Sequence, residues 1–217
     1  MKTKIAKKLL DDMISQQLVK RGISSPDVIE AFSHVQRHLF VPKIYQTEAY
    51  EDYPLDIGFE QTISQPYIVA LMVEKANIKT TDRVLEIGTG SGYLTAILSE
   101  LSAEVYTVEV IDELYERAKI LLNHLGYDNI HYLNDNGYFG WQEFAPYDKI
   151  IVSAAAQYLP SYLVDQLKDG GKLIVPLETR GWQELFAMTK DPFGLHREKL
   201  CNCRFVPMVE GIPKNQN

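Results

Sequence analysis

A group of glycines and carboxylates in the middle of the chain has the residue types and spacing of a nucleotide-binding turn. Glu86 comes just before Gly88, Gly90 and Gly92, in a G-x-G-x-G pattern that follows a strand-like run and opens a helix-like one. Glycines in such a turn let the backbone approach a ligand closely and adopt positive φ angles. Glu109 ends the next strand-like run, about 20 residues further on, where a carboxylate can accept hydrogen bonds from both hydroxyls of a ribose. This spacing predicts a ligand that contains adenosine.

The charge beside the glycines indicates which adenosine ligand the turn would hold. The Glu86 carboxylate suits a ligand that carries an ammonium and a sulfonium, and it would repel a pyrophosphate. Tyr93 stands at the position that would complete the G-x-G-x-x-G pattern of dinucleotide-binding proteins. The sequence therefore favours S-adenosylmethionine as the cofactor. The simplest alternative is that residues 88–92 form only a tight turn and that Glu109 is a solvated strand end.

The elements that must position this turn alternate between strands and helices. Strands are predicted at 83–87, 105–109, 130–133, 149–153 and 172–177, and helices at 93–101, 112–125 and near 161–167. Crossovers of this length predict an α/β fold with a doubly wound, mainly parallel sheet covered by helices on both faces. Two further runs, 184–190 and 199–206, have no helix between them. They predict an antiparallel pair at the edge of the sheet.

An N-terminal helical extension precedes the first strand signal. Residues 3–21 carry apolar side chains on one helical face, and Gly22 is the expected C-terminal cap. Ser25 is the expected N-cap of a second helix that runs to about Arg37. Residues 40–64 are rich in aromatic residues and prolines without a clear period, which predicts loops or short edge strands.

The length and composition predict one globular domain over residues 1–217, which has 46% hydrophobic and 24% charged residues. We divide it into an N-terminal helical and substrate-loop region (1–78), a cofactor-binding core (79–180) and C-terminal strands at the substrate edge (181–217). The first apolar run is interrupted by Asp11 and Asp12, so neither a signal peptide nor a membrane span is expected.

Charge and cysteine content predict the surroundings of the protein. A formal net charge of −7 argues against nucleic acid as a partner, because nucleic-acid binding depends on clustered Lys and Arg. Cys201 and Cys203 are too few for a disulfide framework, which favours the reducing cytoplasm. Together with His196 they also lack the ligand spacing of structural zinc, so no metal is predicted. The sequence does not predict an oligomeric state.

Beyond the glycine turn, the sequence resembles the protein-L-isoaspartate O-methyltransferase family over nearly the whole chain. The most specific segment is Gln61-Thr-Ile-Ser-Gln-Pro-Tyr-Ile-Val-Ala70. Further similar segments are Arg21-Gly-Ile23, Phe40-Val-Pro42, Val84 to Ala96, Ala145-Pro-Tyr-Asp148, Gly170-Gly171 and Arg204-Phe-Val-Pro207. The resemblance implies a Rossmann-like class I S-adenosylmethionine methyltransferase. It also implies methylation of the free α-carboxylate of L-isoaspartyl residues in damaged proteins, which initiates their repair.

The resemblance also implies roles for individual residues. Ser64 is expected beside the transferred methyl group as the catalytic residue, and Thr62 and Ile63 are expected to help enclose the cofactor. The backbone that holds the substrate peptide is expected at Phe205, Val206 and Pro207. The acceptor carboxylate is already ionised at neutral pH, so no general base is required. The local sequence leaves two roles open for Ser64, because either Ser64 or Gln65 can be the N-cap of the helix that follows.

Three positions depart from the usual pattern of the family. Asn136-Gly137 stands where an Asp-Gly pair is usual, and Glu60 and Glu178 stand where glycine is usual. Asn136 and Gly137 are still expected at the cofactor, with the Asn136 amide oxygen accepting a hydrogen bond from the adenine amino group. The two glutamates bring negative charge toward an anionic substrate. The three departures together leave open a related S-adenosylmethionine-binding protein with another acceptor, such as RNA or a small metabolite, or with lost catalysis.

Overall fold

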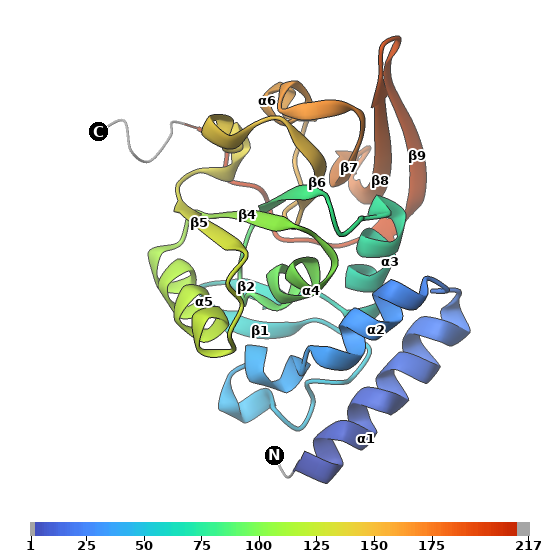
Figure 1. Cartoon of the computed structure of the whole chain (residues 1–217), viewed down its shortest axis with the longest axis vertical. Coiled ribbons are helices and arrows are strands. Elements are labelled where there is room, and N and C mark those ends of the chain that lie inside the picture. Colours follow the sequence, from blue (N-terminus) through green and yellow to red (C-terminus); the bar gives the residue numbers. More distant parts are fainter. Residues whose placement is uncertain (1–2, 212–217) are drawn as a thin grey trace.

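The computed structural model describes residues 3–211. Within this range a seven-stranded sheet has the strand order β5-β4-β3-β6-β7-β8-β9 (Figure 1). The strands are β3 (Arg83–Ile87), β4 (Glu104–Glu109), β5 (Ile130–Asn134), β6 (Tyr147–Val152), β7 (Leu167–Thr179), β8 (Trp182–Asp191) and β9 (Gly194–Cys203). All neighbouring pairs from β5 to β7 are parallel, whereas β8 is antiparallel to both of its neighbours. The predicted mainly parallel sheet with an antiparallel edge is confirmed.

Helices cover both faces of this sheet, because neighbouring residues of a buried strand point to opposite sides. Val84 of β3 belongs to one hydrophobic core and Leu85 to the other. The helices are α1 (Thr3–Met13), α2 (Pro26–His34), α3 (Pro66–Ala76), α4 (Tyr93–Leu101), α5 (Asp112–His124) and α6 (Ser161–Asp165). The first core lies between one face of the sheet and the five helices from α1 through α5. The second core lies between the other face and α6. The N-terminal extension thus shares a core with the strands, as a single domain requires, although the predicted division of the chain stays a prediction.

The N-terminal extension forms one end of the molecule, below the sheet in Figure 1. From α1 the chain continues through a π-helical turn (Ile14–Leu18) and a 3-10 turn (Val19–Arg21). This helical segment ends at Gly22, whose φ of 98° is the left-handed cap conformation that glycine favours. The predicted first helix and its cap therefore agree with the structure.

The second predicted helix differs from the structure at its end and in its cap. It ends at His34, before the expected Arg37, and Ser25 holds the N-cap position without a side-chain hydrogen bond. The backbone N–H groups of Ser24 and Ser25 instead donate to the Glu74 carboxylate of α3, at 2.9 and 3.2 Å. Glu74 of α3 thus holds the segment that leads into α2, a tertiary contact that local sequence cannot reveal.

A short hairpin occupies the region that the sequence left without a period. Its strands are β1 (Leu55–Gly58) and β2 (Gln61–Ile63), and its turn residues Phe59 and Glu60 have φ angles of 57° and 59°. The carbonyl of Ile57 accepts a hydrogen bond from the Arg117 side chain of α5 at 2.8 Å. This contact ties the hairpin to the Rossmann-like part of the fold, and β2 leads directly into Ser64.

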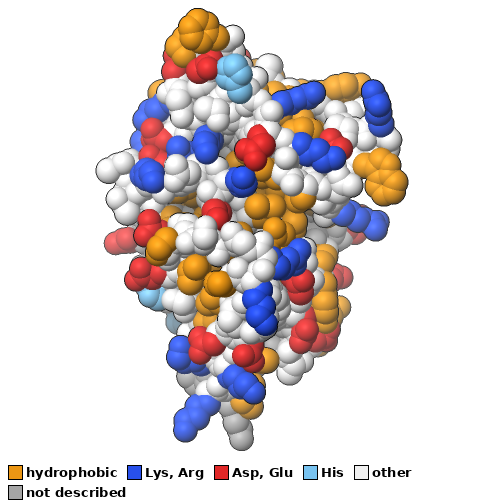
Figure 2. Space-filling view, turned by 90° about the vertical axis from the view of Figure 1, so that its right-hand side faces the viewer, with side chains coloured by type: hydrophobic (Ala, Val, Ile, Leu, Met, Phe, Trp, Pro, Cys, Tyr) orange, Lys and Arg blue, Asp and Glu red, His pale blue; other side chains and the backbone are white. Residues whose placement is uncertain are grey.

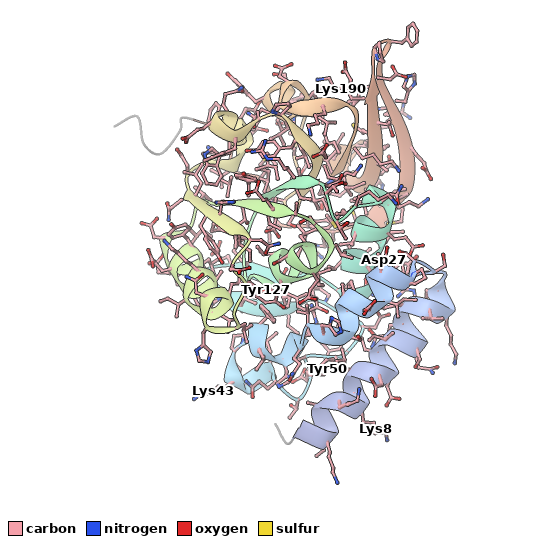
Figure 3. All side chains as sticks on the ribbon, viewed as in Figure 1. Lys8, Asp27, Lys43, Tyr50, Tyr127 and Lys190 are labelled. Atoms are coloured by element: carbon pink, nitrogen blue, oxygen red, sulfur yellow. The ribbon has the colours of Figure 1, made fainter. Side chains whose placement is uncertain are left out.

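The hairpin β8–β9 projects at the other end of the molecule (Figure 1). Near the turn of this hairpin the Lys190 ammonium donates to the carbonyl of Val164 in α6 and to that of Leu167, the first residue of β7 (Figure 3). On the side formed by α1, α3 and β9, apolar side chains gather in the middle with Lys and Arg around them (Figure 2). Among residues 3–211, no helix combines the length and the apolarity that a membrane span requires.

Candidate active site

The main cavity opens at the carboxyl ends of the parallel strands. Its volume, including the space open to solvent, is about 950 Å³. Its lining includes Gly88 and Gly90 after β3, Glu109 at the end of β4, Asn136 after β5 and Ser153 after β6. Since the chain continues from β3 to β4 on one side and places β6 on the other, β3 marks the point where the strand order reverses. Ligands of doubly wound sheets bind at this point.

The glycine turn brings backbone, and not side chains, to the cavity. Gly88 and Gly90 have φ angles of 91° and 55°, which glycine adopts without strain. Gly92 was expected in the cofactor site, but it does not line the cavity. It is the left-handed N-cap of α4, and a Cβ there would lie 3.0 Å from Leu122. Gly92 therefore permits close packing of α4 on α5 behind the cavity.

Glu109 is held in place by backbone donors. Its Oε2 accepts from Gly90 N at 2.8 Å, and its Oε1 accepts from the N–H groups of Val110 and Ile111 at 2.9 and 3.0 Å. A carboxylate has about four acceptor sites, so these three bonds leave about one for a ligand. The buried carboxylate thus links the glycine turn to the end of β4. It still has an acceptor site with which it can bind a ligand in the cavity.

Glu86 does not present a charge to the cavity, which corrects the expectation from the sequence. It is fully buried on the α4 side of β3 and does not line the cavity. Its Oε2 accepts from the hydroxyls of Thr95 and Thr107 at 2.6 and 2.7 Å, whereas Oε1 has no hydrogen-bond partner among residues 3–211. Burial raises the pKa of the Glu86 carboxyl to about 8, so the group is mainly protonated at neutral pH.

Ser64 lies where the main cavity meets a second one. The second cavity has an open volume of about 630 Å³ and shares Thr62, Ser64, Ser153 and Val206 with the first. Helix α3 begins at Pro66 with Gln65 in the N-cap position, so the alternative in which Ser64 caps the helix is wrong. The Ser64 hydroxyl makes no hydrogen bond to another residue between 3 and 211, and it is free to meet a ligand from either cavity.

The segment 205–207 borders both cavities. Phe205 and Val206 line the second cavity, and Val206 and Pro207 line the first. Gln183 of β8 binds both backbone groups of Phe205, at 2.6 and 3.2 Å. Ala155 N donates to the Val206 carbonyl at 2.8 Å. Of the three residues expected to hold a peptide, Val206 therefore keeps its N–H group free within the part of the chain that the structure describes.

Comparison with known proteins identifies the family to which the chain belongs. The model of the protein-L-isoaspartate(D-aspartate) O-methyltransferase family matches residues 7–212. The chain belongs to this family. A protein-L-isoaspartate O-methyltransferase of Dictyoglomus turgidum is 52% identical over 191 residues, which cover 88% of this chain and 87% of the relative. One of Picosynechococcus is 50% identical over 196 residues, with 90% and 88% covered.

Two solved structures of protein-L-isoaspartate O-methyltransferases share the fold of this family member. One is 33% identical with a TM-score of 0.83, and the match covers 95% of this chain and 66% of that longer chain. The other, a Plasmodium falciparum protein named for the same activity, was solved in complex with S-adenosyl-L-homocysteine. It is 30% identical with a TM-score of 0.81, covering 94% of this chain and 98% of that one. The Rossmann-like methyltransferase fold is therefore confirmed.

The positions at which this isoaspartate methyltransferase family member departs from the usual pattern lie in different surroundings. Glu60 and Glu178 are exposed and line neither cavity, Glu60 in the β1–β2 turn and Glu178 near the end of β7. Asn136 and Gly137 do line the main cavity. The Asn136 amide oxygen, expected at the adenine, instead accepts from Tyr138 N at 3.0 Å. Thr62 and Ile63 also line the main cavity, as expected of residues that enclose a ligand.

Two features of the site were not found from the sequence. Ser153 lines both cavities, and its position at the end of the predicted strand 149–153 was the available signal. Tyr93 also lines the main cavity, with the fully buried Arg37 guanidinium 4.9 Å from its ring centroid. Burial lowers the pKa of Arg37 to about 10. Figure 3 shows Tyr50, whose hydroxyl lies 2.8 Å from His38 Nδ1, in the same N-terminal region.

The histidines stand apart from both cavities. All five lie within the described residues, and none lines either cavity. His34 lies 3.1 Å from the Glu100 carboxylate, and His131 lies 3.4 Å from that of Glu104, so these two form surface ion pairs when protonated. Among residues 3–211, no three His, Cys, Asp or Glu side chains form a group that could hold a metal ion.

Proposed function

We propose that this chain transfers the methyl group of S-adenosylmethionine to the free α-carboxylate of L-isoaspartyl residues in damaged proteins and peptides. The observation that carries the proposal is the position of Ser64 at the junction of two cavities. One cavity has the glycine turn and the acid of an adenosine site, and the other is bordered by an extended backbone segment that suits a peptide. Family membership supports the same conclusion.

The residues of the main cavity fit S-adenosylmethionine. The turn at Gly88 and Gly90 would lie against the cofactor through its backbone, and Glu109 would accept a ribose hydroxyl through its remaining acceptor site. Thr62 and Ile63 would cover the cofactor from the β1–β2 hairpin, and Asn136 would lie beside the adenine ring of the cofactor. When bound, S-adenosylmethionine supplies a methyl group made electrophilic by a sulfonium.

The protein residues would act on the acceptor by binding and orienting it. A carboxylate with a pKa near 3.3–3.9 is ionised at neutral pH and needs no general base, in keeping with cavities that no histidine lines. The Ser64 hydroxyl would donate a hydrogen bond that fixes one carboxylate oxygen. The free Val206 N–H would bind the peptide, and Arg204 of the second cavity would attract the negative charge. Closure of the site around the carboxylate would strip water from it.

The rival functions have less support. Of the three departures that suggested another acceptor or lost catalysis, Glu60 and Glu178 lie outside both cavities, and only Asn136 lines one. The net charge of −7 counts against RNA. The absence of nucleic-acid and membrane partners and the cytoplasmic location stay predictions.

The deciding experiment compares two peptides that differ only in one linkage. The purified chain is incubated with methyl-labelled cofactor and with a peptide that contains either L-isoaspartate or L-aspartate at the same position. We expect label in the isoaspartyl peptide alone, because the second cavity must receive a carboxylate on a shifted backbone. Equal labelling of both peptides, or of neither, would contradict the proposal.

A further inference from the structure

The amide of Asn136 has only one orientation that satisfies its surroundings. Asn136 is 5% exposed and is the N-cap of the 3-10 turn Gly137–Phe139, where its Oδ1 accepts from Tyr138 N at 3.0 Å. An amide carries its acceptor on one side and its two donors on the other. Turning it over would place the NH2 group against the Tyr138 N–H and leave that N–H without an acceptor.

The other end of the amide is therefore a donor that faces the main cavity. Within residues 3–211 the Asn136 Nδ2 has no hydrogen-bond partner. It does not belong to the fully buried polar atoms without a partner, so part of its surface is accessible. Asn136 lines the main cavity, so the open space beside Nδ2 is that cavity. The side chain thus offers N–H groups, and not an oxygen, to whatever lies there.

The position of Asn136 is where the base of an adenosine would lie. The glycine turn, Glu109 and Asn136 follow the three adjacent strands β3, β4 and β5. Adjacent strands are about 4.8 Å apart, so these three ends span about 10 Å, comparable with an adenosine. A ribose at Glu109 and an amino-acid portion at the glycine turn leave the β5 end for the base. The 6-amino group of adenine is a donor, whereas its ring nitrogens are acceptors.

We propose that Asn136 donates a hydrogen bond to a ring nitrogen of the cofactor's base, so that this side chain does not select for the 6-amino group. The proposal rests on the function proposed above, because it takes the cofactor to contain adenosine. It gives the Asn-Gly departure a consequence: the chain tolerates a cofactor that lacks the 6-amino group. An aspartate at this position would keep one oxygen on Tyr138 N and turn an acceptor to the base.

Calorimetric binding of S-adenosylhomocysteine and of its 6-deamino analogue tests the proposal without using activity. The unaltered chain should bind the two within about threefold. Asn136→Asp, which matches asparagine in shape and keeps the cap, should prefer the 6-amino ligand at least tenfold while its melting temperature without ligand stays the same. Asn123→Asp on the exposed part of α5 adds the same charge away from the cavity and should behave like the unaltered chain.

Each outcome of the binding test decides between the possibilities. A tenfold preference for the 6-amino ligand in the unaltered chain would overturn the proposal, because the amide would then present its oxygen. Equal behaviour of the unaltered chain and Asn136→Asp would also overturn it, because Asn136 would not touch the base. Both results leave the proposed function intact. Failure of the unaltered chain to bind S-adenosylhomocysteine at all would remove the proposed function and this inference with it.

Discussion

The replacement Glu86→Gln tests the protonation state of the buried carboxyl that precedes the glycine turn. Glu86 is fully buried, and its Oε2 accepts from two threonine hydroxyls. Glutamine has the same shape, keeps an oxygen for Thr95 and Thr107, and resembles the protonated acid at the unpartnered Oε1 position. The two chains should therefore have similar stability in acid and diverge as the pH rises.

The expected size of the effect follows from the change in pKa. Burial raises the pKa of Glu86 from 4.5 to about 8 in the folded protein, so the unfolded chain releases this proton first. The stability associated with the neutral carboxyl is fully present below pH 4.5 and is lost as the pH rises through about 8. Each pH unit in this window costs about 1.4 kcal/mol of unfolding free energy. The wild-type chain should lose roughly 5 kcal/mol relative to Glu86→Gln across the whole window.

Urea denaturation between pH 5 and 9 measures this divergence directly. The difference in unfolding free energy between Glu86→Gln and wild type should increase with pH and level off above about pH 8. Glu116→Gln removes an exposed carboxylate of α5 and should follow the wild-type profile. Parallel profiles for Glu86→Gln and wild type would refute the reasoning, because they would mean that Glu86 is ionised in the folded protein at neutral pH.

Four further predictions follow from the site. Glu109→Ala should weaken S-adenosylhomocysteine binding by about 1–3 kcal/mol in calorimetry, and unchanged affinity would contradict its ribose role. Ser64→Ala should lower kcat for isoaspartyl peptides without changing cofactor affinity or Tm, whereas a stability loss of about 1 kcal/mol with normal kcat would indicate a cap after all. Glu60→Gly should raise the unfolding free energy by about 1 kcal/mol, since it relieves a left-handed φ. Its KM should stay that of wild type at low and high salt, and a lower KM at low salt would restore an electrostatic role for Glu60. Turnover should show no histidine inflection between about pH 6 and 7, and a bell-shaped profile abolished by replacing one histidine would disprove this.

The elements of the sheet were predictable because their signals are local. The strand at 83–87 and the helix at 93–101 have the bounds that the sequence predicted. A buried parallel strand is a short apolar run, and a glycine turn separates it from its helix. The strand predicted at 172–177 instead begins at Leu167, because β7 runs through Gly170 and Gly171 with an irregular register against β6. Backbone pairing with a neighbouring strand decided this, and glycine content alone could not.

The region between Phe40 and Ser64 was the least predictable part of the fold. Its β1–β2 turn uses Phe59 and Glu60 at positive φ, where Asn-Gly would be the usual signal. Contacts from distant residues hold it in place, such as the Arg117 side chain on the Ile57 carbonyl. The strain of such a turn is tolerated only because the rest of the fold supports it.

The sequence by itself determined the fold class, the glycine turn after β3 and the acid at the end of β4, because glycine spacing, strand length and helix starts act over a few residues. Only the tertiary structure decided where each carboxyl and amide points. Glu86 and Glu109 both lie on strands beside the turn, yet one is sealed beneath α4 and mainly protonated, and the other reaches the cavity. The Asn136 oxygen was expected at the adenine and instead caps a turn. Burial and hydrogen-bond partners arise from the packing of distant segments, so the charge and donor character of a site residue are fixed only when the chain has folded.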